Sequence, residues 1–223
     1  MTITDEGLEQ EGTLVSVQVG QPARMEFRGK VWESAIGKRP VVGRVWLDAA
    51  NLAGDRQHNL KYHGGPDKAV CCFCAEHYPL LQQEFDLDER FAYGAFGENF
   101  TVSGLLESDV CIGDVYTVGG ARVQVSQPRQ PCVNVARKWE RRALPKRMET
   151  LGYTGYYLRV LEEGEVGAGD AVSLMERPHP DLSVHRINRA MYQHESTPEQ
   201  DALLARLPEL ASSIRRLFQR RTK

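Results

Sequence analysis

The chain has 223 residues, of which 41% are hydrophobic and 26% are charged. This length and composition allow an adequate core without disulfides or a structural metal, and they exclude wholesale disorder. The 28 Lys and Arg residues against 30 Asp and Glu residues leave a formal net charge of −2, so bulk charge gives no support for nucleic-acid or membrane binding. An acidic start, no long apolar run and five cysteines predict a cytoplasmic protein with free thiols.

Residues 1–11 are polar and acidic, and we expect a flexible leader there. Residues 12–177 are dominated by short alternating or β-branched runs bounded by glycine, which are typical of strands. The predicted strands are Leu14–Val19, Val41–Leu47, Ala69–Cys74, Asn99–Val102, Asp114–Val118, Arg122–Val125, Tyr156–Leu161 and Ala171–Met175. Helical patterns are brief, at Glu76–Phe85 and Val133–Arg142. Gly119-Gly120 predicts a hairpin, and the whole pattern predicts a mainly β (α+β) fold with a closed or strongly curved, mostly antiparallel sheet.

Residues 181–223 form a different segment, with three predicted helices. Ser183 can cap the first, and Thr197-Pro198-Glu199-Gln200 has the order of a capping box for the second. The third is predicted to start at Pro208. The three helices are too small for a core of their own, so we expect this appendage to dock on the β-domain or on a second subunit. We also expect the β-domain to keep its fold when the appendage is deleted.

The segment Ser126-Gln127-Pro128-Arg129-Gln130-Pro131-Cys132 is the most informative for chemistry. Its prolines stiffen the chain and remove backbone donors. Cys132 lies just before a predicted helix, and helix-start amides together with Arg129 favour a thiolate, the form that attacks electrophiles or binds soft metals. The alternative is a small buried residue that closes a turn.

Two further loops contain glycine beside polar side chains. In the segment from Lys61 to Lys68, Gly64 and Gly65 permit close backbone approach, while His63, Asp67 and Lys68 supply charge and hydrogen bonds. The alternative is a turn stabilised by Asp67.

The second such loop is Gly94-Ala95-Phe96-Gly97-Glu98-Asn99-Phe100. There Asn99 either bonds a heterocycle or caps the turn. Upstream, Ser34, Lys38 and Arg39 lie in a loop where cations could bind a phosphate, and a solvated surface is the alternative.

Two other patterns favour structural roles. Cys71, Cys74 and His77 have a C-x-x-C-x-x-H spacing, but they lie in an apolar run without a second ligand pair, so a core strand is favoured over a zinc site. The basic residues near the end of the chain are typical of a last helical turn, although His185, Arg189, Arg215 and Arg216 could rim a substrate entrance.

Several of these segments occur together in one order. They are H-G-G-P-D-K-A-V at 63–70, G-A-F-G-E-N at 94–99, I-G-D at 112–114, S-Q-P-R-Q-P-C at 126–132, G-Y-Y-L-R-V-L at 155–161 and A-G-D-A-V at 168–172. The series closely resembles the small bacterial MOSC-domain proteins linked to resistance against 6-N-hydroxylaminopurine. The resemblance spans roughly residues 12–177, and the helical tail is similar to the extension of that subgroup.

The resemblance implies a MOSC-type β-barrel that binds the molybdenum cofactor, Mo-molybdopterin. It implies that Cys132 is the metal ligand, which agrees with a soft thiolate binding a soft metal site. The expected cofactor-binding residues are Ser34, Lys38, His63, Gly64, Lys68, Glu98, Asn99, Arg129 and Gln130. Cations among them can neutralise the cofactor phosphate, and amides can pair with the pterin.

The implied reaction is the two-electron reduction of an N–OH group in N-hydroxylated purine bases and amidoximes. Asp67, His63 or Glu98 could relay the proton. The sequence carries no nicotinamide or flavin fingerprint, no pyridoxal-phosphate domain and no iron–sulfur cysteine set, so electrons are expected from a separate protein. Membrane partners are not expected, and a homodimer is one expected assembly.

Two other functions compete with the reductase. One is a non-catalytic module that carries the cofactor or sulfur. The other is a nucleic-acid-binding module that uses the basic tail, which the slightly negative net charge disfavours.

Overall fold

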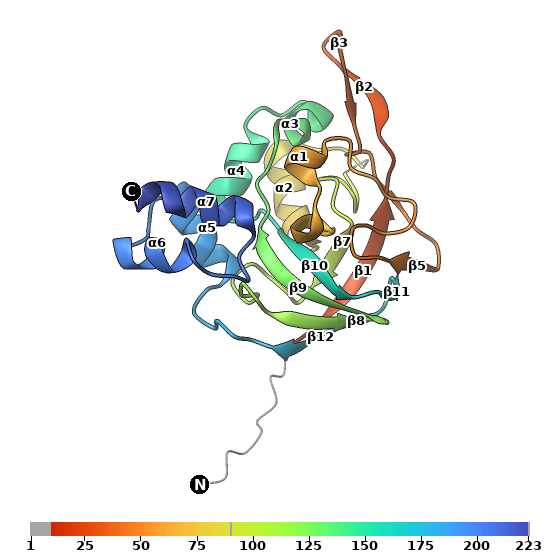
Figure 1. The fold of residues 1–223 in the computed structure, drawn as a ribbon. Coiled ribbons are helices and arrows are strands. Elements are labelled where there is room, and N and C mark those ends of the chain that lie inside the picture. Colours follow the sequence, from red (N-terminus) through yellow and green to blue (C-terminus); the bar gives the residue numbers. More distant parts are fainter. Residues whose placement is uncertain (1–9, 90, 223) are drawn as a thin grey trace.

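The computed structural model describes residues 10–89 and 91–222. Its centre is a closed β-barrel, seen in Figure 1, with the strand order β12-β8-β9-β10-β6-β7-β1 and closure through a β12–β1 pairing. Neighbouring strands are antiparallel except β6 and β7, which are parallel. The barrel strands are β1 (Glu11–Val19), β6 (Val70–Cys74), β7 (Phe100–Ser103), β8 (Val115–Val118), β9 (Ala121–Pro128), β10 (Tyr156–Glu162) and β12 (Ala171–Glu176). The predicted barrel is confirmed.

The barrel wall follows from side-chain alternation in the sequence. In β9, Ala121, Val123 and Val125 are buried while the residues between them are only half-buried, which is the period-2 pattern of a strand with one apolar face. The predicted hairpin at Gly119-Gly120 is present: Gly119 has a φ of +54°, and Val118 pairs with Ala121. No helix among the described residues is long and apolar enough to cross a membrane.

Smaller strands differ from the sequence prediction. Within the predicted strand Val41–Leu47, only β5 (Arg44–Leu47) is a strand, and the short β4 (Arg39–Pro40) precedes the predicted run. The two are separate because Gly43 adopts a φ of +84° and interrupts the extended chain. The hairpin of β2 (Ala23–Phe27) and β3 (Lys30–Ser34) projects beyond the barrel in Figure 1.

That hairpin was not predicted, although its first strand alternates apolar and polar residues; its second strand does not. Another missed strand, β11 (Gly164–Gly167), pairs with β5.

The predicted leader lies mostly outside the described residues, which begin at Gln10. The side chain of Gln10 accepts a hydrogen bond from Arg177, and Glu11 pairs with Ser173 of β12. Gln10 and Glu11 therefore belong to the barrel and not to a leader, because their polar groups complete the β1–β12 seam.

Short helices cover one side of the barrel with an aromatic layer. They are α1 (Leu60–His63), η1 (Pro66–Lys68), α2 (His77–Phe85), α3 (Val133–Trp139) and α4 (Leu144–Leu151). Phe73 of β6 points into a cluster with Tyr78, Phe96 and Trp139, while Cys72 and Cys74 belong to the barrel core. The helix predicted over Val133–Arg142 ends early because Glu140 adopts a left-handed φ of 54°.

The appendage consists of α5 (Val184–Tyr192), α6 (Pro198–Leu204) and α7 (Ser212–Arg221). Ser183 accepts the Arg186 backbone N–H, and Thr197 forms the predicted capping box. The third helix starts at Ser212 and not at Pro208. The reason is that Leu210 closes a turn to Leu207, and the N–H of Ala211 donates to Ser126 of β9 at 2.8 Å.

The appendage and the barrel share one apolar core. Figure 1 shows the three helices stacked against the side of the barrel. Six large apolar residues of the appendage, each at most 2% exposed, join the same buried cluster as the barrel strands: Val184, Ile187, Leu204, Leu210, Ile214 and Phe218. This packing argues against the expectation that the barrel keeps its fold alone.

We therefore predict that deleting residues 181–223 unfolds the chain. Burying one large apolar side chain contributes about 1.5–3 kcal/mol, so the loss would match a typical domain stability of about 5–15 kcal/mol. Circular dichroism melts and size-exclusion chromatography of the truncated and full chains test this. A truncated barrel that melts within a few degrees of the full chain would contradict it.

Candidate functional site

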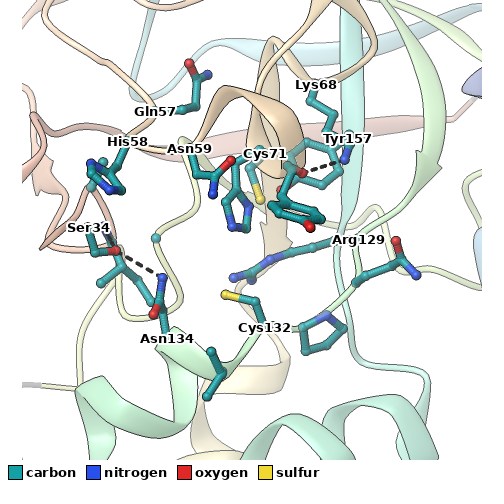
Figure 2. Close-up of a pocket in the computed structure, with 18 of the residues that line it drawn as sticks. Ser34, Gln57, His58, Asn59, Lys68, Cys71, Arg129, Cys132, Asn134 and Tyr157 are labelled. Carbon is teal, nitrogen blue, oxygen red and sulfur yellow. Dashed lines mark hydrogen bonds between the residues drawn. The ribbon is translucent and has the colours of Figure 1, made fainter. Parts of the chain in front are cut away.

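A cavity of about 1110 Å³ lies where the loops at one end of the barrel meet the helices. Figure 2 shows part of its wall, with Ser34 and Asn134 on one side, Tyr157 and Lys68 on the other, and Arg129 and Cys132 between them. The lining comes from the end of β3, the segment before and through α1, the chain after β9, and one face of α7. The barrel end thus brings together segments far apart in sequence.

Most predicted site residues meet in this cavity. Its lining includes Ser34, Lys38, His63, Lys68, Asn99, Arg129, Gln130 and Cys132. Three predicted residues are not part of the lining, namely Gly64, Asp67 and Glu98.

Cys132 presents a half-buried thiol to the cavity at the residue just before α3. Its side chain makes no capping hydrogen bond to that helix. A second thiol, Cys71 of β6, also lines the cavity but is 5% exposed, and burial raises the pKa of the Cys71 thiol. Cys132 is therefore the more accessible of the two thiols for a soft electrophile or metal.

Arg129 is a buried cation with spare hydrogen-bonding capacity. Its side chain is held by the Phe96 carbonyl, to which Nη2 donates, and its backbone N–H donates to Gly155 at 2.9 Å. The other terminal nitrogen, Nη1, is buried and has no hydrogen-bond partner among the described residues. An unpaired buried guanidinium nitrogen is costly, so this atom marks a place where an anionic ligand would fit.

Lys38 is fixed by a buried polar network. Its Nζ lies 2.6 Å from Asp55, and the two side chains are 7% and 0% exposed. Asn99 donates to the same carboxylate at 2.9 Å and to the Gln18 carbonyl at 3.2 Å, and it accepts from the Cys71 N–H at 3.2 Å. Both amide hydrogens of Asn99 are therefore used by the protein, and its Oδ1 is the atom that could still accept a hydrogen bond from a ligand such as the pterin.

His63 and Lys68 lie in a strongly electropositive part of the cavity. Burial and the nearby charges of Arg129, Lys68 and Lys38 lower the pKa of His63 to about 4. Burial also lowers the pKa of Lys68, whose Nζ donates to the Tyr62 carbonyl at 2.6 Å. His63 is therefore a neutral imidazole at pH 7.

We predict that His63 titrates near pH 4 in the cofactor-free chain, measured by NMR pH titration of its ring. Because its folded pKa is below its unfolded value of 6.5, the folded state binds fewer protons between these values. His63 therefore contributes stability above pH 6.5 that is lost as the pH falls toward 4. A His63 pKa at or above 6.5 would contradict this account of the local field.

Asp67 lies outside the cavity and serves structure. Its carboxylate is 2.8 Å from Arg159 of β10, and it accepts the Ser212 N–H at 3.3 Å. Both oxygens are engaged, so Asp67 connects η1 to β10 and to the start of α7. This geometry corrects its predicted role as a proton relay.

Glu98 and Gly64 also have structural roles. Glu98 is fully buried and accepts hydrogen bonds from Tyr78, Thr101 and the backbone N–H groups of Gly94 and Phe96. It holds its own loop in shape and is not part of the lining of this cavity. At Gly64, a Cβ would lie 2.9 Å from Leu60, so that glycine serves helix α1 rather than a ligand.

The C-x-x-C-x-x-H pattern contributes to a buried hydrogen-bond network. His77 Nε2 lies 2.6 Å from Glu107, and the Cys74 thiol lies 3.2 Å from the Leu105 carbonyl. Glu107 also accepts the Gly155 N–H at 2.7 Å. Cys74, His77 and Glu107 have the ligand types of a metal site, but each has a protein partner here, which agrees with the predicted core role.

Sequence reasoning missed most of the α7 contribution. Arg216, one of the expected rim residues, does line the cavity, together with Ser213, Leu217 and Arg220. The other expected residues, His185, Arg189 and Arg215, do not. The i, i+3, i+4, i+7 spacing of the four lining residues places them on one helix face, but this spacing does not distinguish a face that lines a cavity from one that faces solvent.

The cavity is strongly cationic. One acidic side chain, Glu33, belongs to the described lining. The cations in that lining are Lys38, Lys61, Lys68, Arg129, Arg137, Arg216 and Arg220. Such an excess favours a ligand with more than one negative charge.

Comparison with known proteins divides the chain into the same two parts. The family described as MOSC domain matches residues 59–173, and the family described as YiiM-like, 3-alpha helix domain matches residues 182–221. The chain is similar to the Uncharacterized protein YflK of Bacillus subtilis, with 46% identity over 184 residues and 82% of each chain covered.

Two further relatives extend this likeness. A protein named Reductase from Gibberella moniliformis is 36% identical over 184 residues, which cover 81% of this chain and 32% of that protein. The crystal structure of YiiM from Geobacillus stearothermophilus superposes with a TM-score of 0.80 at 36% identity, covering 95% of this chain and 100% of that chain. The structural likeness therefore includes both the barrel and the three C-terminal helices.

Proposed function

The chain belongs to the MOSC-domain family, and from that premise we propose that it is a molybdenum-cofactor-dependent reductase of N-hydroxylated compounds. The observation that carries the proposal is the cationic cavity with the accessible thiol of Cys132 beside the unpaired Nη1 of Arg129. The relative named Reductase supports the oxidoreductase class.

The residues of the cavity fit the cofactor chemically. Mo-molybdopterin brings a dithiolene and an anionic phosphate, so the protein has to offer one soft thiolate and several cations. Cys132 would hold the metal, and Arg129 and Lys68 would hold anionic oxygens. Ser34, a 5%-exposed hydroxyl already linked to Asn134 at 3.3 Å, and the exposed amide of Gln130 would contact the polar pterin.

Lys38 contributes charge while its ammonium group remains paired with Asp55.

When bound, the molybdenum centre would supply the two-electron redox change that cleaves the N–O bond. The net step is R–NHOH + 2 e⁻ + 2 H⁺ → R–NH₂ + H₂O. Of the three predicted proton relays, His63 is the one that lines the cavity, and its neutral ring can donate at one nitrogen and accept at the other.

Electrons would come from a separate donor protein. We place the reaction in the cytoplasm, where the five free cysteines would remain reduced.

The test is turnover of 6-N-hydroxylaminopurine to adenine by protein produced in a host that makes the cofactor. A chemically reduced viologen supplies electrons, so the natural donor is not needed. We expect adenine formation that depends on bound molybdenum. Protein that holds molybdenum yet reduces no N-hydroxylated compound with any donor would instead favour a non-catalytic carrier of the cofactor.

A further inference from the structure

Helix α7 turns one face to the cavity and the opposite face to the core. Ser213, Arg216, Leu217 and Arg220 line the cavity, while Ile214 and Phe218 are buried in the shared core at 1% and 0% exposure. The buried face fixes the rotation of the helix. The two arginines are therefore held toward the cavity by packing and are not merely basic residues at a chain end.

The start of α7 is attached to the elements that build the site. Ser213 Oγ donates to Gln127 of β9 at 3.0 Å, and the Ser212 N–H donates to Asp67 at 3.3 Å. Gln127 precedes Cys132 by five residues in the same segment, a path of at most about 17 Å. The cavity-lining face of α7 thus forms a wall of the cavity close to Cys132, and Cys132 itself belongs to another segment.

Arg216 and Arg220 are two cations of this cavity with free guanidinium groups; among the other lining cations, the exposed Lys61 is also free of hydrogen bonds and ion pairs to described residues, and the buried Arg129 keeps one unpaired nitrogen. Both are exposed, and no hydrogen bond or ion pair joins either guanidinium to another described residue. Lys38, Lys68 and Arg137 have partners in Asp55, the Tyr62 carbonyl and Asn134. Two unpaired guanidinium groups one helical turn apart form a binding surface for a phosphate, which accepts paired N–H donors.

We infer that the substrate carries an anionic group that Arg216 and Arg220 bind, so that N-hydroxylated nucleoside phosphates are preferred over the free bases and nucleosides. This inference rests on the proposed reductase function and names its substrate class. The base would reach toward Cys132 while its phosphate lies on α7. The phosphate is unchanged in the reaction, and the N–O bond is reduced as in the step above.

The binding test uses cofactor-loaded protein and two unreactive probes, adenosine 5′-monophosphate and adenosine, in isothermal titration calorimetry. We expect the monophosphate to bind at least about tenfold more tightly. The double variant Arg216→Gln/Arg220→Gln should lose this preference and keep its molybdenum content. Arg206→Gln is the matched control, because Arg206 is exposed in the same appendage and lies outside the cavity lining.

The kinetic test compares N6-hydroxyadenosine with its 5′-monophosphate. The double variant should raise KM for the monophosphate about tenfold or more and leave the neutral nucleoside unaffected. Equal binding of the two probes by the unmodified protein, or a double variant that loses molybdenum, would overturn the inference and leave the reductase proposal standing. A monophosphate preference without turnover of either substrate would overturn the reductase proposal alone.

Discussion

Cys132→Ser should reduce N-hydroxy reductase activity to background while leaving the free energy of unfolding within about 0.5 kcal/mol of the unmodified protein. The thiol is half-buried and makes no capping bond, so the near-isosteric change removes little packing. A hydroxyl is a hard and weakly acidic ligand, and it would not replace a soft thiolate on molybdenum. Viologen-linked turnover and denaturant unfolding measure the two effects.

Two other cysteines provide controls for this result. Cys111→Ser removes a buried thiol that is not part of the cavity lining, and it should keep activity per folded molecule. Cys71→Ser tests the rival thiol inside the cavity. Loss of activity in Cys71→Ser with retention in Cys132→Ser would contradict the assignment of the metal ligand.

Gly155→Ala should destabilise the protein by about 2–5 kcal/mol. Gly155 has a φ of +74°, and an added Cβ would lie 2.1 Å from the Cys72 carbonyl oxygen. The left-handed backbone costs a non-glycine residue about 1–2 kcal/mol, and overpacking adds about 1–3 kcal/mol. Because the Gly155 carbonyl also holds the Arg129 backbone, cofactor retention should fall as well. Chemical denaturation gives the stability change.

The matched control is Gly169→Ala. Gly169 has a φ of +94° but open space around its Cα. This variant should therefore show only the loss of stability that comes from a non-glycine residue at positive φ. Equal destabilisation by the two substitutions would contradict the steric account of Gly155.

The barrel could be predicted because its strands carry local signals. The alternation in β9 and the Gly119-Gly120 turn determine a hairpin without knowledge of distant residues. The β2–β3 hairpin was missed although Ala23, Met25 and Phe27 alternate with polar residues in its first strand. Its second strand has Val31 and Trp32 side by side, which breaks the apolar period.

The candidate site could be predicted for those residues whose side-chain type allows few chemical roles. Cys132 and Arg129, in a proline-stiffened segment after a strand, do meet in the cavity. Asp67 and Glu98 were assigned chemical roles because carboxylates suit both catalysis and structure. Their partners, Arg159 for Asp67 and Tyr78 for Glu98, become neighbours only in the folded barrel.

The cavity-lining face of α7 could not be predicted from the sequence for a different reason. Its arginines resemble the solvated end of a helix in the sequence, and tertiary packing of Ile214 and Phe218 determines that they face a cavity. Nothing local to residues 212–221 distinguishes a cavity from solvent.

X-ray absorption at the molybdenum edge tests the central claim most directly, because it reports the metal's ligands independently of substrate, donor and turnover. The cofactor-loaded protein should show one more sulfur neighbour on molybdenum than its Cys132→Ser variant, with the metal retained in both. An identical sulfur coordination in the two proteins would contradict the assignment of Cys132 as the metal ligand and, with it, the account of this cavity.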